Sequence, residues 1–278
     1  MDSQTIKLIL TSTVVSALVG GLVTLLSQQR LLARKAQLDY EFEAKKRLYE
    51  AVGPLRFQLL LAVRDVVRRF HAHHGTNWNM DPNEYYVKSC IYRILAPLAV
   101  GQLIERQMSL VDFAVDKEAI SLLSFVTAAE RMLTGSDIVL NHPDLDWSSQ
   151  TQHLFRDNLR SAADKLIVPE PGKPERVMSF AEFDQQYDLL KTESLRGLVR
   201  IFAHCQHSLT ENPIFWVRMI GYTRVCSMHL QSRSAANLGF NAREIPVDEM
   251  IMATRDPHFM SQLNLFRHCL KGMLNDGI

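Results

Sequence analysis

The sequence predicts an all-α protein with three parts: a single N-terminal transmembrane helix, a helical stalk and a cytoplasmic helical bundle. Three observations lead to this prediction. Residues 8–26 form an uncharged apolar run, and apolar side chains recur at helical spacing along most of the remaining chain. Alternating strand patterns are missing, as are Asn-Gly or Asp-Gly hairpin turns between such strands. We therefore divide the chain into residues 1–29, 30–72 and 73–278.

Composition and charge limit the functional classes. Hydrophobic residues make up 47% and charged residues 22%, which is typical of a globular protein. The net charge is +1, so we expect no nucleic-acid partner. The positive charge is concentrated in residues 30–72, with ten Lys or Arg against five Asp or Glu. Four scattered cysteines without a CxxC pair indicate reduced thiols in a cytosolic compartment.

The apolar run Leu8–Leu26 is predicted to be a retained transmembrane anchor. A helix of this length spans about 28 Å, close to the thickness of the hydrocarbon core of a bilayer. The alternatives are a cleavable signal peptide, which would need a basic start and a small-residue exit, and a buried core helix. Basic residues follow the run and only Lys7 precedes it, so the positive-inside rule places the C-terminal side in the cytoplasm and the N-terminus outside. In a bacterium this would be the inner membrane. The basic residues nearest to the membrane are Arg30, Arg34, Lys35, Lys45, Lys46 and Arg47.

Small residues recur every fourth position within the anchor, at Ser12, Ser16, Gly20 and Thr24, beside a second row of Thr13, Ala17 and Gly21. Small side chains at this spacing let two helix backbones approach closely, so this face is a candidate for self-association. The alternative is the ordinary abundance of such residues in membrane helices.

The stalk contains no Pro or Gly before Gly53-Pro54, where we expect the helix to break or bend and a new helix to begin. Seven positions follow a 3–4 spacing: Leu31, Lys35, Leu38, Phe42, Lys45, Tyr49 and Val52. This spacing favours a helix that packs on a partner, and a short coiled coil is one such arrangement. An amphipathic helix on its own domain or on lipid headgroups is the alternative.

The remaining chain reads as a series of helices that pack into a bundle. Asp116 and the capping box Ser179-x-x-Glu182 mark two helix starts, and Asn212-Pro213 and Asp256-Pro257 mark two more. We expect helices over 84–107, 117–133, 148–166, 182–202 (in one or two pieces), 213–237 and 259–273, with a short helix after Pro246. The Pro-rich stretch 168–174 is expected to be a loop and a candidate subdomain boundary at 168–178.

Local candidates for metal binding are histidines and acidic residues. His204 and His207 are three positions apart and share one face of a helix, so both could reach one ion. Further ligands would have to come from His268-Cys269 or from Cys226 and His229. Two weaker clusters are His71, His73 and His74, and Asp137, Asp144 and Asp146. Each cluster has a structural alternative. His204 and His207 would be partly exposed histidines on a helix that buries Cys205, the His71 cluster would lie at a helix C-terminus, and the acidic residues would form turns and caps.

Phosphate-binding glycine loops, a GxSxG elbow and an HExxH motif are absent from the sequence, and no catalytic residue or cofactor can be assigned. The layout therefore favours a membrane-anchored interaction, sensing or scaffold module that binds a protein partner and self-associates. Two alternatives are a membrane-anchored metal-dependent hydrolase using His204 and His207, and a membrane-acting defence or stress effector.

Overall fold

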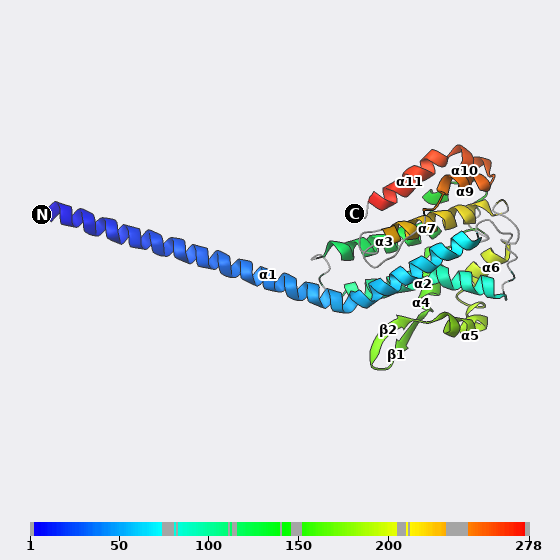
Figure 1. Ribbon diagram of the computed structural model, residues 1–278, viewed down its shortest axis with the longest axis horizontal. Helices are drawn as coiled ribbons and strands as arrows, with labels where there is room; N and C mark the ends of the chain where they lie inside the picture. Colours follow the sequence, from blue (N-terminus) through cyan, green and yellow to red (C-terminus); the bar gives the residue numbers. More distant parts are fainter. Residues whose placement is uncertain are drawn as a thin grey trace.

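The protein is a helical bundle from which one very long helix extends (Figure 1). The computed structural model describes residues 3–73, 81, 83–110, 112, 116–139, 141–145, 152–204, 210, 212–231 and 244–275. Within these ranges, the side chains of residues 3–19, 73, 203–204 and 273–275 are outside the description. The prediction of a helical bundle is confirmed.

Helix α1 runs from Ser3 to His73 without interruption and has two different environments. Residues 20–47, which we call the free segment, extend away from the bundle and are exposed apart from the half-buried Glu41 and Ala44. From residue 48 onward one face is buried in the bundle. The buried side chains recur every three or four residues, the spacing that keeps side chains on one side of a helix. They are Leu48, Val52, Leu55, Leu59, Val63, Val66 and Phe70.

Of the two outcomes expected at Gly53-Pro54, a break or a bend, the break and the start of a new helix are wrong, because Pro54 lies inside α1. A proline in a helix interior removes one backbone hydrogen bond and its ring crowds the carbonyl of residue 50, so it favours a bend. Figure 1 shows that α1 changes direction where it joins the bundle. The cost of the proline is offset because Leu48, Val52, Leu55 and Leu59 are buried on both sides of it.

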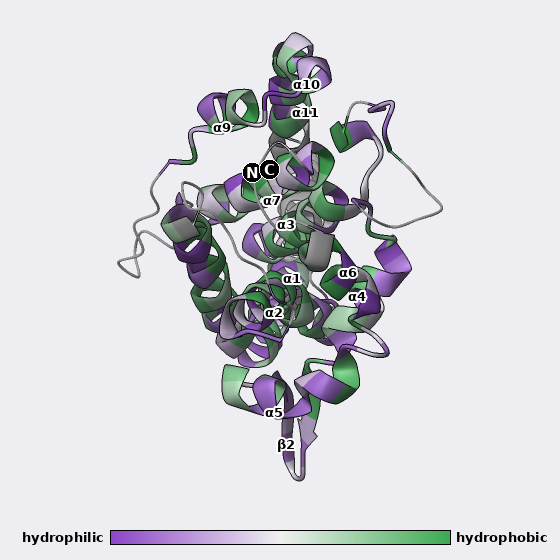
Figure 2. Ribbon diagram, turned by 90° about the vertical axis from the view of Figure 1, so that its right-hand side faces the viewer, coloured by the Kyte–Doolittle hydropathy of each residue, from purple (hydrophilic) through white to green (hydrophobic). Residues whose placement is uncertain are grey.

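Helices α2 (Tyr85–Met108), α3 (Lys117–Thr134) and α7 (Pro213–Gln231) form the centre of the bundle together with the second half of α1. α1 packs on α2 and α7, and α3 packs on α7. In the view along the bundle (Figure 2), the hairpin and α5 lie on one side of this centre, and α9 to α11 lie on the other. α2 continues through Pro97 and is buried along most of its length.

The cap residues predicted from sequence begin the expected helices. Asp116 accepts a hydrogen bond from the backbone N–H of Glu118, and Ser179 and Glu182 form a complete capping box at the start of α5 (Phe180–Leu190). The predicted 182–202 segment is indeed in two pieces, since α6 (Arg196–His204) follows separately. α9 (Val247–Ala253) is the short helix after Pro246.

Two helix lengths differ from expectation. α4 covers only Arg156–Asp164, whereas 148–166 was expected, because residues 153–155 are non-helical. The last predicted helix is divided into α10 (Pro257–Ser261) and α11 (Leu263–Asn275). A short 3-10 helix, η2 (Asp137–Val139), precedes α4.

The Pro-rich stretch was expected to be a loop, and it is instead an antiparallel hairpin of β1 (Ile167–Glu170) and β2 (Lys173–Val177). Ile167 pairs with Val177, and Gly172 has a φ of +71°, the left-handed conformation that a tight turn requires and glycine adopts most easily. Pro169 and Pro174 are tolerated because each strand has only one hydrogen-bonded neighbour. The strands were missed because the alternating pattern is only four or five residues long.

Candidate functional site

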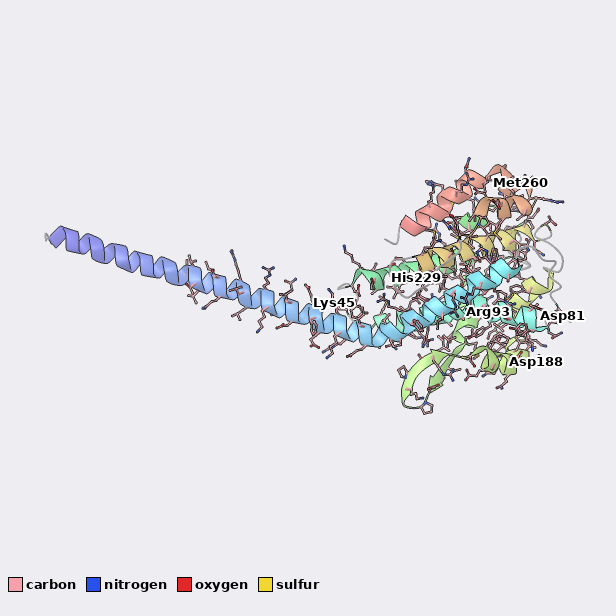
Figure 3. The ribbon with its side chains drawn as sticks, viewed as in Figure 1. Lys45, Asp81, Arg93, Asp188, His229 and Met260 are labelled. Carbon is pink, nitrogen blue, oxygen red and sulfur yellow. The ribbon has the colours of Figure 1, made fainter. Side chains whose placement is uncertain are left out.

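The predicted membrane-proximal basic side chains lie on the free segment of α1. Figure 3 shows Lys45 on the part of α1 outside the bundle. All six are exposed, and their charges are available to lipid headgroups or to another chain. They are Arg30, Arg34, Lys35, Lys45, Lys46 and Arg47.

The free segment is braced where it enters the bundle. The Tyr40 hydroxyl donates to Oδ2 of Asp112 over 2.8 Å, and a hydrogen bond to Asp116 raises the pKa of Tyr49. Two turns further on, Arg56 is paired with Glu118, with 2.5 Å between Nη2 and Oε2. These contacts join α1 to the chain that leads into α3, so the direction of the helix is fixed at its exit from the bundle.

An apolar stripe runs along the free segment. Leu31, Leu38 and Phe42 are 67%, 57% and 68% exposed. At about 100° per residue they lie on one side of the helix, roughly 80° from the face that is buried beyond Leu48. The bundle therefore does not use this stripe.

Two residues of the predicted small-residue face are described in full. Gly20 has open space around it, since an added Cβ would meet nothing within 4 Å, and Thr24 donates a hydrogen bond to the Gly20 carbonyl over 2.8 Å. Ser12 and Ser16 lie in α1, but their side chains are outside the description. Self-association through this face stays a prediction.

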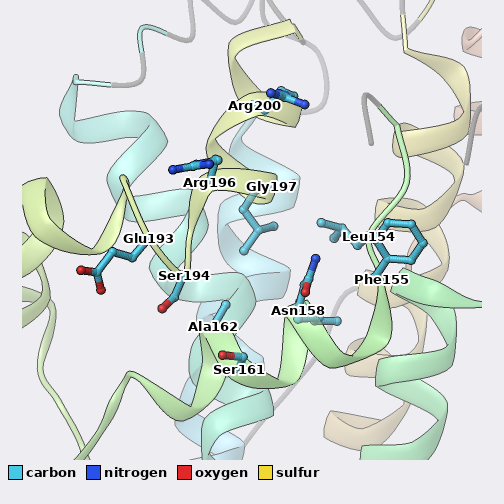
Figure 4. Close-up of a pocket in the computed structure, with 12 residues that line it drawn as sticks. Leu154, Phe155, Asn158, Ser161, Ala162, Glu193, Ser194, Arg196, Gly197 and Arg200 are labelled. Atoms are coloured by element: carbon cyan, nitrogen blue, oxygen red, sulfur yellow. The ribbon is translucent and has the colours of Figure 1, made fainter. Parts of the chain in front are cut away.

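The bundle contains a polar cleft of about 470 Å³ between α4 and the chain around α6 (Figure 4). Arg196 and Arg200 are one helical turn apart, and Asn158 and Ser161 line the cleft from α4. Guanidinium groups bind carboxylates and phosphates through two parallel hydrogen bonds, so the two arginines suit an acidic ligand, while Glu193 on the same lining carries the opposite charge. Arg196 also donates to the carbonyl of Thr192, which orients it. Sequence reasoning missed this cleft, and the i, i+4 spacing of the two arginines is the signal that could have found it.

A larger cleft of about 600 Å³ lies between α7, α9 and α11. Four of its charged lining residues form two ion pairs, Arg267 with Asp248, and Arg224 with Glu244 at 3.5 Å, and Glu249 and Lys271 also line it. These charges balance one another across the cleft.

Arg218 on α7 is a buried cation, only 1% exposed. Its Nη1 donates to the Gly135 carbonyl over 2.7 Å, and its Nη2 lies 3.3 Å from Nδ1 of His153. Burial, together with the charge of Arg218, lowers the pKa of His153 to about 4, while burial lowers that of Arg218 to about 10. His153 is therefore a neutral acceptor at physiological pH, and the pair joins α7 to the chains that flank α4 and α3.

Two arginines converge where the end of α1 meets α2. Nη2 of Arg69 donates to the hydroxyl of Ser89 over 2.5 Å, and Arg93 donates to the same oxygen. The Arg69 guanidinium also lies 5.8 Å from the centre of the Tyr85 ring, and these neighbours, Ser89 first, lower the pKa of that phenol. The beginning of α2 is thus held against α1 by polar contacts as well as by the core.

The histidine hypothesis falls mainly on residues outside the description. His204 ends α6 but its side chain is not described, and His207 lies between described ranges, so their convergence stays a prediction. Cys226 and His229 are one turn apart on α7; burial raises the pKa of Cys226 and lowers that of His229 to about 4. Among the described residues, no group of three or more His, Cys, Asp or Glu is placed to hold a metal ion.

The other two clusters have structural contacts where they are described. Asp137 is paired with Arg131, and Asp144 is exposed in the turn after η2, where its backbone N–H donates to Nδ1 of His142 over 3.1 Å. His71 is half-buried near the end of α1. The side chain of His73, and both His74 and Asp146, fall outside the description.

Searches of protein-family models, curated proteins and solved structures find no match to this chain.

Among the described residues, one helix is long and apolar enough to cross a membrane: α2, Tyr85–Met108. Its apolar part is 83% buried inside the bundle, which is the environment of a core helix. The described side chains begin at Gly20, so they include only the last part of the predicted anchor.

Proposed function

We propose that this chain is a single-pass membrane protein whose helical bundle is held in the cytoplasm on a rigid helical arm, as an interaction or scaffold module. The observation that carries the proposal is the continuity of α1. One helix contains the apolar run 8–26, the exposed basic residues after it and the side chains from Leu48 to Phe70 that form part of the core.

The membrane end of the free segment exposes a continuous apolar surface. Leu22, Val23, Leu25 and Leu26 are 62%, 56%, 60% and 50% exposed. Burying such a side chain is worth about 2 kcal/mol, so four adjacent exposed ones favour an apolar environment strongly. A bilayer around residues 8–26 supplies that environment without any protein partner.

The charge distribution supports the orientation. The exposed basic residues from Arg30 to Arg47 directly follow the apolar run. Each Lys or Arg near an anionic surface contributes about 1 kcal/mol, and such residues are concentrated on the cytoplasmic side of membrane helices. The bundle would therefore lie in the cytoplasm.

The arm sets a distance between the bilayer and the bundle. Eighteen residues separate Arg30 from Leu48, and at 1.5 Å per residue this corresponds to about 27 Å. A continuous helix, braced by the Tyr40–Asp112 hydrogen bond, would fix the orientation of the bundle as well as its distance. Such an arrangement suits a module that presents a binding surface to partners near the membrane, and the cleft with Arg196 and Arg200 is the surface that we expect to bind acidic groups.

The membrane assignment is tested by two charges placed in the anchor. The variant Leu18→Arg/Gly21→Arg introduces two guanidinium groups near the middle of the run, each costing about 3 kcal/mol. The matched control, Gln28→Arg/Gln29→Arg, adds the same charge just outside it. We expect wild type and the control to float with liposomes and to resist extraction at high pH, and the anchor variant to remain in the soluble fraction.

Orientation is tested by fusing, to the C-terminus, a phosphatase that is active only outside the cytoplasm. We expect this fusion to be silent and a fusion with a fluorescent protein that matures in the cytoplasm to be bright. An active phosphatase would contradict the orientation, and a fully soluble wild-type chain would contradict the anchor.

A further inference from the structure

We infer that the free segment of α1 pairs with the same segment of a second copy of this chain, as a parallel two-stranded coiled coil. The proposal goes beyond anchoring a bundle at the membrane, and it rests on the proposed function for its orientation and for the confinement of the two helices in one bilayer. Three arguments lead to it: the free segment has an unused apolar stripe, charges lie on both sides of that stripe, and two copies anchored in one bilayer have parallel free segments.

The stripe has the spacing of a coiled-coil seam. Leu31, Leu38 and Phe42 occupy seam positions, with Lys35 and Lys45 between and after them. The face that α1 buries beyond Leu48 continues along the free segment as Arg30, Arg34, Gln37 and Glu41, which are polar. The apolar stripe is therefore a separate surface, and the exposure of its three apolar members is more than half in each case.

The charges beside the stripe are complementary between two copies. The seam of a coiled coil has two alternating kinds of position. In a parallel pair, the residue directly before a position of the first kind faces the residue five positions further along the partner helix. Here Arg34 would face Asp39 of the second copy, and Glu41 would face Lys46. Arg34, Asp39 and Lys46 are exposed, and Glu41 is half-buried with a hydrogen bond from Gln37 at 3.1 Å. By symmetry this gives four attractive pairs and no repulsive pair in this register.

The bilayer selects the parallel orientation. The same four residues would also attract one another in an antiparallel pair, so charge alone does not fix the direction. Two chains anchored in one bilayer with their bundles on one side have parallel free segments, because both helices leave the same surface. An antiparallel pair would bring each bundle to the membrane end of its partner.

The anchor also explains why a short seam is sufficient. Free segments of barely two heptads with two lysines in the seam would pair weakly in solution, since isolated helices of this length are marginal. Confinement to a bilayer raises the effective concentration of one helix near another. Gly20 and Thr24 lie on the side of α1 that carries the stripe, so the contact can continue into the membrane.

Cysteine cross-linking of the full chain in liposomes tests the geometry. The background carries Cys205→Ser and Cys269→Ser; Cys90 and Cys226 stay, since both are buried. We expect a short thiol cross-linker to join Leu38→Cys chains into dimers at least five times more efficiently than Ala36→Cys chains. Position 36 is the matched control, as it lies on nearly the opposite side of the same helix. Equal yields at both positions, or none at position 38 in chains that still float with the liposomes, would overturn the pairing and leave the anchor intact.

Charge reversal tests the partner and the register. In the Leu38→Cys background, Arg34→Glu turns two attractive pairs into repulsive ones and is expected to lower the dimer yield about ten-fold at limiting protein. The double variant Arg34→Glu/Asp39→Arg restores the attraction in trans, and we expect it to recover the yield. Within one helix, the double variant loses the attraction between Lys35 and Asp39. It gains one between the arginine introduced at position 39 and Glu43, so the stability of the helix is nearly unchanged. Failure of the double variant to recover the yield would contradict the parallel register.

Discussion

At the scale of single residues, Arg218 and His153 share an unusual buried environment. A buried guanidinium normally has a carboxylate partner, because removing a charge from water is costly. Here two of its nitrogen atoms are satisfied by a backbone carbonyl and a neutral imidazole. The guanidinium has only donors, so Nδ1 of His153 must be the acceptor and the proton of the neutral ring is on Nε2.

This arrangement predicts a loss of stability in mild acid. The pKa of His153 in the folded protein is about 4, below its ordinary value of 6.5, because burial and Arg218 disfavour the imidazolium. The folded state therefore binds the proton less well than the unfolded state. The contribution of neutral His153 to the free energy of unfolding is complete above pH 6.5. It is lost progressively as the pH falls from 6.5 toward 4. At about pH 5 the loss should be about 2 kcal/mol.

Thermal melting of the full chain in mild detergent measures this effect. His153→Gln keeps an oxygen that accepts from Arg218 but does not titrate, so we expect its melting temperature to fall less between neutral pH and about pH 5 than that of wild type. His229 has a lowered pKa of the same sign and should leave part of the dependence in place. Identical pH profiles for wild type and His153→Gln would show that this histidine is not responsible.

At the scale of elements, the crossing of α2 and α3 depends on Gly101. A Cβ added there would lie 2.8 Å and 2.9 Å from the two methyl groups of Val126, which is buried and, being β-branched, stiff at χ1. A Cβ added at Gly221 on α7 would lie closer still, 2.6 Å from the sulfur of Met132, but methionine is flexible. The two glycines allow α2 and α7 to approach α3 closely.

We expect Gly101→Ala to destabilise the bundle by about 2 kcal/mol, because overpacking outweighs the roughly 1 kcal/mol that alanine contributes within a helix. Gly272→Ala on α11, where an added Cβ meets nothing within 4 Å, is the matched control and should be neutral or stabilising. Gly101→Ala/Val126→Ala should regain part of the loss in thermal melting. A stabilising Gly101→Ala would mean that α2 and α3 are further apart than described.

Elements with local signals could be predicted from the sequence. Asp116, Ser179 with Glu182, and Asp256 each supply a side chain that accepts a backbone N–H of the first helical turn, and each begins a helix as expected. Pro54 was misread because its local preference for ending a helix is overridden by the buried side chains on both sides of it. The hairpin was missed because its strands are only four or five residues long, and the cleft at Arg196 and Arg200 was missed because its walls come from separate segments of the chain. The Arg218–His153 pair likewise joins residues 65 positions apart, which no local pattern reveals.

At the scale of the whole molecule, the proposed function would make the distance between membrane and bundle depend on one helix, α1. Its two ends have different partners, a bilayer in our proposal and the core of the bundle in the structure. The free segment between them carries the exposed charges and the apolar stripe. A change of stiffness in that segment should therefore alter the position of the bundle without altering its fold.

Ala33→Pro tests this separation of roles. Ala33 is exposed in the free segment, and a proline there removes a hydrogen bond and bends or breaks the helix at a cost of about 3 kcal/mol. We expect the distance between the bilayer surface and a label at Met252→Cys, which replaces an exposed side chain of α9, to become shorter on average and more widely distributed. Spin-label or fluorescence distance measurements in nanodiscs report this, with Ala33→Gln as the matched control. The melting temperature of the bundle should be unchanged, because the buried side chains begin fifteen residues later, at Leu48. A distance distribution as broad in wild type as in Ala33→Pro would contradict a rigid arm, and a lower melting temperature would mean that the free segment contributes to the bundle.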